Sequence, residues 1–185
     1  DKVNFMAKYA RGLICTTIDK KIAIRLGLNP MVSSNNSNYE TAFTISVDDV
    51  NADTGISAKE RDDTIKIIAN PVSQKTQLVA PGHIFPLIAK DGGVLERTGH
   101  TEGSFDLCTL AGISGGAVIC EIIKDDGTMA RRDDLDIFGE KYDLHTVFIS
   151  DLVEYRLANE SLIKLVKDEN ITFMGQDAIK YEFQD

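Results

Sequence analysis

The feature that most constrains the fold is a run of apolar residues from Ala117 to Ile123 that only Glu121 interrupts. Such a continuous apolar run is typical of a strand whose two faces are both covered. Strand-like and helix-like patterns alternate along the rest of the chain, with some antiparallel hairpin character. The sequence therefore predicts an α+β fold, in which a mixed, twisted sheet carries helices on both faces in three layers.

Short local signals place several of the individual elements. Ser57 and Glu60 have the spacing of a capping box that starts a helix, and Asp19 and Gly27 bracket a shorter one. The polar segment 33–39 predicts a loop. The other expected elements are helices at 6–13, from Thr101, at 134–142 and from Asp151 past Arg156 toward 171–183, and strands at 14–18, 42–47, 84–89, 94–97 and 146–150, with Gly92 and Gly93 joining the strands at 84–89 and 94–97.

Charge and cysteine content exclude several classes of protein. The chain has 20 Lys and Arg against 29 Asp and Glu, a net charge of −9, which disfavours nucleic acids and anionic membranes as partners. It contains no apolar run as long as a membrane span, and its first residues lack the apolar core of a signal peptide. Cys15, Cys108 and Cys120 lie in apolar stretches without CxxC spacing, so we expect no disulfide framework and a reducing, cytoplasmic compartment.

The segment from Gly93 to Thr101 combines the groups from which phosphate sites are built. A strand would deliver Arg97, Gly99 would let the backbone turn closely, and a helix would start near Thr101. The free amides of a helix N-terminus, a threonine hydroxyl and an arginine fork together bind phosphate. The alternative is a capped helix after a tight turn, without a ligand.

Glu121 is a second candidate, because an unpaired carboxylate inside an apolar strand is costly to bury. A buried Glu121 would face a cavity or meet a cation, and burial would raise its pKa toward the range of a general acid or base. The alternative is a carboxylate at the end of a strand that points to water. The sequence leaves both open.

The three histidines are His83, His100 and His145. His100 lies in the candidate phosphate turn, where an imidazole can bind a metal or move a proton, and His83 precedes a predicted strand. Each is equally compatible with an ordinary surface or core residue, and we assign no role to His145. Thr54 is either a backbone anion contact or part of a turn, and Cys15 is most simply a small buried hydrophobe.

Several segments, taken in order, resemble the 3,4-dihydroxy-2-butanone 4-phosphate synthase family of riboflavin biosynthesis. The combination is specific, although no single segment is, and the likeness ends at about residue 157. The segments are Ala10-Arg11-Gly12-Leu13-Ile14-Cys15, Thr54-Gly55-Ile56-Ser57-Ala58 with Arg61, Pro81-Gly82-His83-Ile84-Phe85-Pro86-Leu87, Gly92-Gly93-Val94-Leu95-Glu96-Arg97-Thr98-Gly99-His100-Thr101-Glu102, Asp106-Leu107, Leu110-Ala111-Gly112, Cys120-Glu121 and Asp126-Gly127-Thr128-Met129-Ala130-Arg131.

The resemblance implies an enzyme that converts D-ribulose 5-phosphate to 3,4-dihydroxy-2-butanone 4-phosphate plus formate, uses Mg²⁺ or Mn²⁺, and works as a homodimer. Enolisation, loss of water, skeletal shift and formate release each require protons to be moved. A divalent metal can hold vicinal oxygens and stabilise an enediolate, and a fixed phosphate keeps the carbon chain in register. The implied partner is a small sugar phosphate.

The resemblance also implies roles for particular residues. His83 and Glu121 would be essential for catalysis, and His100 would be a metal ligand. The residues that would bind the substrate are Arg97, Thr98, Gly99, His100, Thr101 and Glu121, with Cys15 and Thr54 lining the pocket.

The family pattern differs from the sequence at both ends. An acidic, flexible loop of the pattern Asp-Asp-Glu-x-Arg-Glu-Asn-Glu-Gly-Asp, which would supply a second metal ligand, has no counterpart. We therefore expect the N-terminal part of the family fold to be missing, and a protein that really began at Asp1 to have negligible activity. After a synthase-like domain at 1–157, we expect 158–185 to be a C-terminal extension, or a linker toward a second domain of GTP cyclohydrolase II type.

Two alternatives to the enzyme hypothesis remain at the level of sequence. The absent acidic loop favours an inactive fragment, or a non-catalytic dimerisation or support domain of a bifunctional riboflavin protein. A different sugar-phosphate isomerase or aldolase would need a Schiff-base lysine or a metal cage of several histidines, and the sequence suggests neither.

Overall fold

A four-stranded sheet forms the centre of the computed structural model, which describes residues 1–161 and 163–184. The strands are β1 (Cys15–Ile18), β2 (Val47–Asp49), β3 (Leu78–Ile88) and β4 (Ala117–Ile119), in the order β2-β3-β1-β4. β1 runs parallel to β3 and antiparallel to β4, and β2 is antiparallel to β3. The predicted mixed sheet is therefore confirmed.

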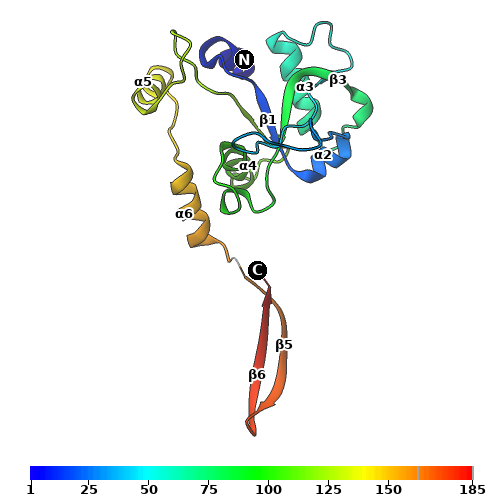
Figure 1. Cartoon of the computed structure of the whole chain (residues 1–185), viewed down its shortest axis with the longest axis vertical. Coiled ribbons are helices and arrows are strands. Elements are labelled where there is room, and N and C mark those ends of the chain that lie inside the picture. Colours follow the sequence, from blue (N-terminus) through cyan, green and yellow to red (C-terminus); the bar gives the residue numbers. More distant parts are fainter. Residues whose placement is uncertain (162, 185) are drawn as a thin grey trace.

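Helices cover both faces of this sheet (Figure 1). Side chains alternate along a strand, so Ile14 and Ile18 point to one face and Thr17 to the other. Ile14 and Ile18 join a hydrophobic core with residues of α1 (Lys2–Phe5), α2 (Lys20–Leu26) and α3 (Ala58–Ala69). On the other face, the Ser104 hydroxyl of α4 (His100–Leu110) donates to Thr17 Oγ1 over 3.3 Å. The layers are thus helices, sheet and helix, as expected.

Two further helices lie outside these layers. α5 (Arg132–Tyr142) packs on the N-terminal helix through the rings of Phe5, Tyr9, Phe138 and Tyr142, with centroids 4.7–6.3 Å apart. α6 (Ile149–Asn159) is attached by the half-buried Arg156, whose Nη1 donates to Gly92 O at 2.9 Å and Asp106 Oδ2 at 2.8 Å. No helix in the described residues is long and apolar enough to cross a membrane.

The elements predicted from capping signals are confirmed. Asp19 Oδ1 accepts from Ile22 N at 2.7 Å, and Gly27, with φ 67°, ends α2. Both hydrogen bonds of the capping box between Ser57 and Glu60 are present at the start of α3. These signals are reliable because a cap satisfies backbone amides within its own turn.

Other expected elements were wrong, each because a contact distant in sequence decides the conformation. Residues 94–97 form no strand: Gly93–Leu95 is a 3₁₀ turn, held where Val94 N donates to Asp106 Oδ2 at 2.8 Å. The N-cap of α4 is Gly99, not Thr101, which is buried in the first turn.

Three more boundaries differ from the expected ones. Of the predicted strand 42–47 only Val47 enters β2, while Phe43 and Thr44 form isolated bridges. The predicted strand 146–150 is irregular up to Phe148 and then becomes α6. The first helix ends in a π-helical turn at Met6–Ala10, and Arg11, not Gly12, takes the left-handed conformation at φ 72°.

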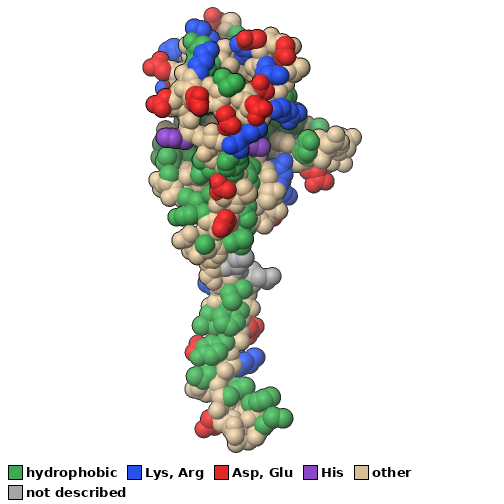
Figure 2. Space-filling model, turned by 90° about the vertical axis from the view of Figure 1, so that its left-hand side faces the viewer, with side chains coloured by type: hydrophobic (Ala, Val, Ile, Leu, Met, Phe, Trp, Pro, Cys, Tyr) green, Lys and Arg blue, Asp and Glu red, His purple; other side chains and the backbone are tan. Residues whose placement is uncertain are grey.

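The C-terminal stretch is a β-hairpin and not the expected continuation of a helix. β5 (Lys164–Phe173) pairs antiparallel with β6 (Gln176–Gln184), apart from the central sheet. Ile179, Tyr181 and Phe183 alternate with polar residues, which is the period of a strand. The hairpin extends away from the body beyond α6 (Figure 1), and hydrophobic side chains are visible on its surface in Figure 2.

Candidate active site

The register of the sheet brings His83 and Glu121 to the same edge. Cys15 of β1 pairs with Phe85 of β3 and with Ile119 of β4. His83 precedes Phe85 by two residues, and Glu121 follows Ile119 by two residues and lies opposite Gly12, so both lie at the end of the sheet where β1 begins. Neighbouring strands lie about 4.8 Å apart, and β3 and β4 are the two neighbours of β1, so their backbones are about 10 Å apart across it. Side chains two positions apart share a face, so His83 and Glu121 belong to the face that carries Cys15 and α4.

Glu121 is anchored through backbone amides. Its Oε2 accepts from Leu13 N at 2.8 Å, and its carbonyl oxygen accepts from Gly12 N at 3.2 Å. A Cβ at Gly12 would come within 2.6 Å of Oε2, so a glycine is required for this approach. Glu121 is exposed, and within the described residues no cation forms an ion pair with it. The water-facing alternative of the sequence analysis therefore describes its position.

Cys15 lies beside Glu121 as a buried, protonated thiol. The residue is 3% exposed. Burial, together with the nearby Glu121 and Cys120, raises the pKa of its thiol to about 12. A thiol with this pKa is not a nucleophile at neutral pH, so Cys15 fits the small buried hydrophobe of the sequence analysis.

His83 is held by a carboxylate that the sequence analysis did not single out. Its ring Nδ1 lies 2.8 Å from Asp48 Oδ2, and its backbone N donates to Asp48 Oδ1 at 2.9 Å. The Asp48 side chain is 9% exposed, whereas that of His83 is 45% exposed. The ring therefore has one buried, anchored nitrogen and one outer edge that is accessible.

The segment before α4 forms the expected turn, but Arg97 has partners inside the protein. Its Nη1 donates to the buried Glu102 at 2.5 Å and its Nη2 to Tyr39 O at 2.9 Å. Glu102 Oε1 also accepts from Lys90 N at 3.2 Å. A guanidinium has five N–H donors, so Nε and the outer N–H groups of Arg97 stay available for a ligand.

The amides at the start of α4 fit an anion. The first backbone bond of this helix runs from Gly103 N to Gly99 O at 2.9 Å, so the amides of His100, Thr101 and Glu102 lack an acceptor within it. No side chain of the described residues caps Gly99. Thr98 and His100 are exposed and Thr101 is buried. This geometry favours the phosphate hypothesis over a simple capped helix.

Thr54 does not have the free donors that an anion contact needs. Its backbone N donates to Glu60 Oε1 at 3.1 Å and its hydroxyl to Glu60 Oε2 at 3.3 Å. Hydrogen bonds from Ser57, Gly55 and Asp53 lower the pKa of Glu60 to about 2. Thr54 is thus part of the cap of α3.

The residues near His100 do not fit a complete metal site. Mg²⁺ prefers six oxygen ligands in an octahedron, and His100 offers a single nitrogen. Glu102, the nearest carboxylate in its helix turn, is paired with Arg97. Across the described part of the chain, no group of three or more histidine, cysteine or acidic side chains is arranged to hold a metal.

The two candidate clusters lie at opposite ends of β1. His83 and Glu121 lie beyond the start of β1, where Leu13 N donates to Glu121 Oε2. Ala89 N donates to Ile18 O at the other end, where Lys90 leads to Glu102 and Arg97. Five residues of extended chain separate Leu13 from Ile18, about 16 Å. One copy of the chain therefore does not bring all the predicted site residues together.

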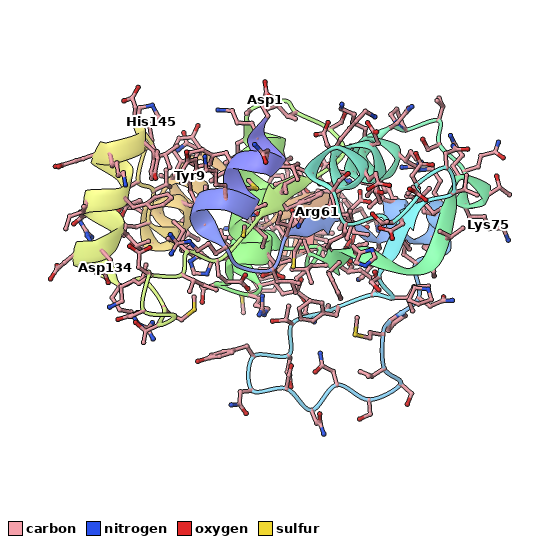
Figure 3. The ribbon with its side chains drawn as sticks, turned by 90° about the horizontal axis from the view of Figure 1, so that it is seen from above. Asp1, Tyr9, Arg61, Lys75, Asp134 and His145 are labelled. Carbon is pink, nitrogen blue, oxygen red and sulfur yellow. The ribbon has the colours of Figure 1, made fainter. Side chains whose placement is uncertain are left out.

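Two residues of this region escaped the sequence analysis. Asp48 directly follows Val47, the last residue of the predicted strand 42–47. This position at the end of a strand was the signal that could have singled it out. Arg61 was quoted only among the segments of the family resemblance, without a role of its own, but it is half-buried and its Nε has no hydrogen-bond partner among the described residues. Figure 3 shows Arg61 in the middle of the molecule, while Lys75, Asp134 and His145 lie at its periphery.

Several known proteins similar to this chain share a name. A family model described as 3,4-dihydroxy-2-butanone 4-phosphate synthase matches residues 1–155. Proteins of that name from Sulfurospirillum multivorans and Campylobacter jejuni are 64% identical over 184 residues and 56% identical over 185 residues. Each alignment covers 100% of this chain but 52% and 55% of the relative, so the chain spans about half the length of the curated relatives it matches.

Solved structures agree with this match. A two-domain 3,4-dihydroxy-2-butanone 4-phosphate synthase from A. baumannii superimposes with a TM-score of 0.86 and 42% identity, covering 99% of this chain and 54% of that one. A synthase structure in complex with two magnesium ions has a TM-score of 0.81 and 34% identity, covering 85% of this chain and 79% of that one.

Proposed function

The chain belongs to the 3,4-dihydroxy-2-butanone 4-phosphate synthase family, and from this premise we propose that the protein converts D-ribulose 5-phosphate to 3,4-dihydroxy-2-butanone 4-phosphate plus formate in riboflavin biosynthesis. The observation that carries the proposal is the placement of His83 and Glu121 at the same end of the sheet, where β1 begins, and on one face of it. The two products together contain all the atoms of the substrate, so the reaction requires proton transfers but no oxidant.

Residues Arg97 to Thr101 are proposed to hold the substrate phosphate. The unpaired amides of His100 and Thr101 and the remaining donors of Arg97 converge at the start of α4. Thr98 and Gly99 complete the turn. The positive end of the helix dipole adds to the attraction for an anion.

His83 and Glu121 are proposed to move the protons. Both side chains are exposed at the sheet edge and both are anchored, through Asp48 and the backbone of Leu13. Cys15 and Thr54 are proposed to line the same pocket, Cys15 as a protonated thiol that keeps this edge apolar. The phosphate anchor would hold the short carbon chain against the two proton-transfer groups.

The proposal includes a homodimer, since one copy keeps the phosphate turn and the proton-transfer pair about 16 Å apart along β1. A second copy, packed so that its sheet edge faces the α4 turn of the first, would complete two equivalent sites. Leu107, Leu110 and Ile113 at the end of α4 are 43–58% exposed and provide apolar surface for such packing.

A divalent cation is part of the proposal because a solved relative is described as a complex with two magnesium ions. We propose His100 as the side chain of this chain that binds the cation. The cation would be either Mg²⁺ or Mn²⁺. Its exposed position at the start of α4 leaves the imidazole accessible. No proton transfer above depends on the ion.

The domain division is likewise proposed, with residues 1–157 as the synthase unit and 158–185 as an extension toward a second domain. The hairpin lies outside the central sheet, and the relatives are about twice as long as this chain. A cytoplasmic location is proposed from the three free cysteines, Cys15, Cys108 and Cys120, which fit a reducing compartment.

Formate release tests the function directly. The native full-length protein, incubated with D-ribulose 5-phosphate and Mg²⁺, is expected to release one formate per substrate consumed. His83→Ala and Glu121→Gln should abolish this release, while the peripheral His145→Ala serves as the matched control and should retain it. Absence of formate from the folded native protein would favour the non-catalytic alternative.

A further inference from the structure

We propose that Asp48 is a positioning residue that fixes the ring of His83 in its Nδ1–H tautomer and leaves Nε2 as the proton-transfer atom. This inference rests on the proposed function, because it assigns a supporting group to one of its two proton-transfer residues. Asp48 itself lies behind the ring and does not reach the substrate.

The hydrogen bonds determine the tautomer. A carboxylate only accepts, so Asp48 Oδ2, at 2.8 Å from Nδ1, requires a proton on that nitrogen. The second oxygen, Oδ1, is occupied by the backbone N–H of His83 at 2.9 Å. Asp48 thus binds both the main chain and the ring of one residue, which fixes the direction of the ring as well as its protonation.

A bulge in the β2–β3 ladder creates this contact. Val47 pairs with Ile84, but the next residue, Asp48, pairs with Val79, so residues 80–83 bulge from β3 opposite Asp48. Bulges re-aim side chains, often beside active sites. Here the bulge turns the backbone N–H and the ring of His83 toward one carboxylate.

Gly55 packs closely against the Asp48–His83 pair. This glycine is buried and has φ +75°, and a Cβ on it would collide with the Asp48 carboxylate and lie 2.8 Å from His83 Nδ1. The neighbouring backbone is braced as well, because Asp49 N donates to Thr64 Oγ1 at 2.9 Å. Gly55 therefore packs directly against the pair, and a side chain at this position would displace it.

The variant Asp48→Asn tests whether this carboxylate determines the tautomer. The backbone N–H of His83 always donates, so it would bind the amide oxygen of Asn and turn the amide NH₂ toward Nδ1. An NH₂ group needs an acceptor, which drives the ring to the Nε2–H tautomer. In that state the substrate-facing nitrogen is already protonated and no longer accepts a proton.

Asp48→Asn is therefore expected to lower kcat by about 100-fold or more, as for other histidines with the wrong tautomer, while KM stays within about threefold. Asp49→Asn is the matched control, since Asp49 Oδ1 accepts only from Asn51 and should be replaceable without loss. Ring ¹⁵N chemical shifts, assigned with His83→Ala, should show Nδ1–H in the native protein and Nε2–H in Asp48→Asn.

Three results would overturn the inference: an Nε2–H ring in the native protein, an unchanged ring in a folded Asp48→Asn variant, or a full rate in that variant. The NMR readout needs no turnover. A native protein that makes no formate but shows the expected tautomers would refute the proposed function. The inference that Asp48 sets the tautomer of His83 would still stand.

Discussion

At the scale of single residues, the strongest prediction concerns Gly55, which supports the Asp48–His83 pair. Gly55→Ala adds a Cβ at φ +75° against the Asp48 carboxylate and the His83 ring. The left-handed conformation costs an alanine about 1–2 kcal/mol, and overpacking adds about 1–3 kcal/mol. Gly127→Ala is the matched control, because Gly127 has φ +84° and open space around it. Urea unfolding should show a larger loss for Gly55→Ala, and equal losses would contradict the packing argument.

Cys15 gives a prediction for the pH dependence of stability. Its thiol pKa is raised from 9.0 to about 12 in the folded protein, so between these values the unfolded chain loses this proton first. The stabilisation is complete below pH 9 and is lost as the pH rises toward 12. The urea midpoint of the native protein should therefore fall more steeply above about pH 9 than that of Cys15→Ala. Parallel pH profiles would show that Cys15 titrates normally.

At the scale of elements, the sequence predicted best where one turn decides the outcome. α2 and α3 follow from Asp19, Gly27 and the Ser57–Glu60 box, all of which act within a few residues. The phosphate turn was predicted in place, but not as a 3₁₀ turn, since its shape depends on Asp106 in the following helix. Asp48 was missed because its role arises from a bulge in the pairing with β3, which no local pattern encodes.

The hairpin of β5 and β6 should contribute little to the stability of the domain that contains the central sheet. It pairs with itself, and an isolated two-stranded hairpin has little stability of its own. A chain ending at Ser161 should therefore unfold within about 2 °C of the longer chain. A chain ending at Phe148 is the contrasting control, because it also loses Arg156, whose pair with Asp106 is 15% and 10% exposed. Breaking such a buried pair costs about 3–5 kcal/mol. A large loss on hairpin removal alone would show that it belongs to the body.

At the scale of the whole molecule, the candidate site is divided between the two ends of the central strand. The family resemblance named candidate residues for the site, but the sequence did not show that they lie at two ends of one strand, which follows from the parallel register of β1 and β3. The net charge of −9 adds a requirement, since a negative molecule binds a phosphate ester only where donors are concentrated locally. In the proposed homodimer, the second copy would bring these donors to the acid–base pair.

Complementation between inactive variants tests this sharing of sites. His83→Ala removes one half of the site and His100→Ala the other, so each alone should be inactive. In a mixed dimer one site carries both substitutions and the other carries neither. With random pairing half of the dimers are mixed, and half of their sites are intact, so about a quarter of the native activity should return. Co-expression with two different affinity tags isolates the mixed dimer for the formate assay.

The control pair is His83→Ala with Glu121→Gln, which lie in the same half of the site, at the end of the sheet where β1 begins. Each site of that mixed dimer keeps one substitution, so no activity should return. Recovery in both pairs would mean that His83 and Glu121 come from different copies. If neither pair recovers activity in dimers shown to be mixed, each chain builds its own site. The two clusters, about 16 Å apart along β1, would then have to come together within one copy.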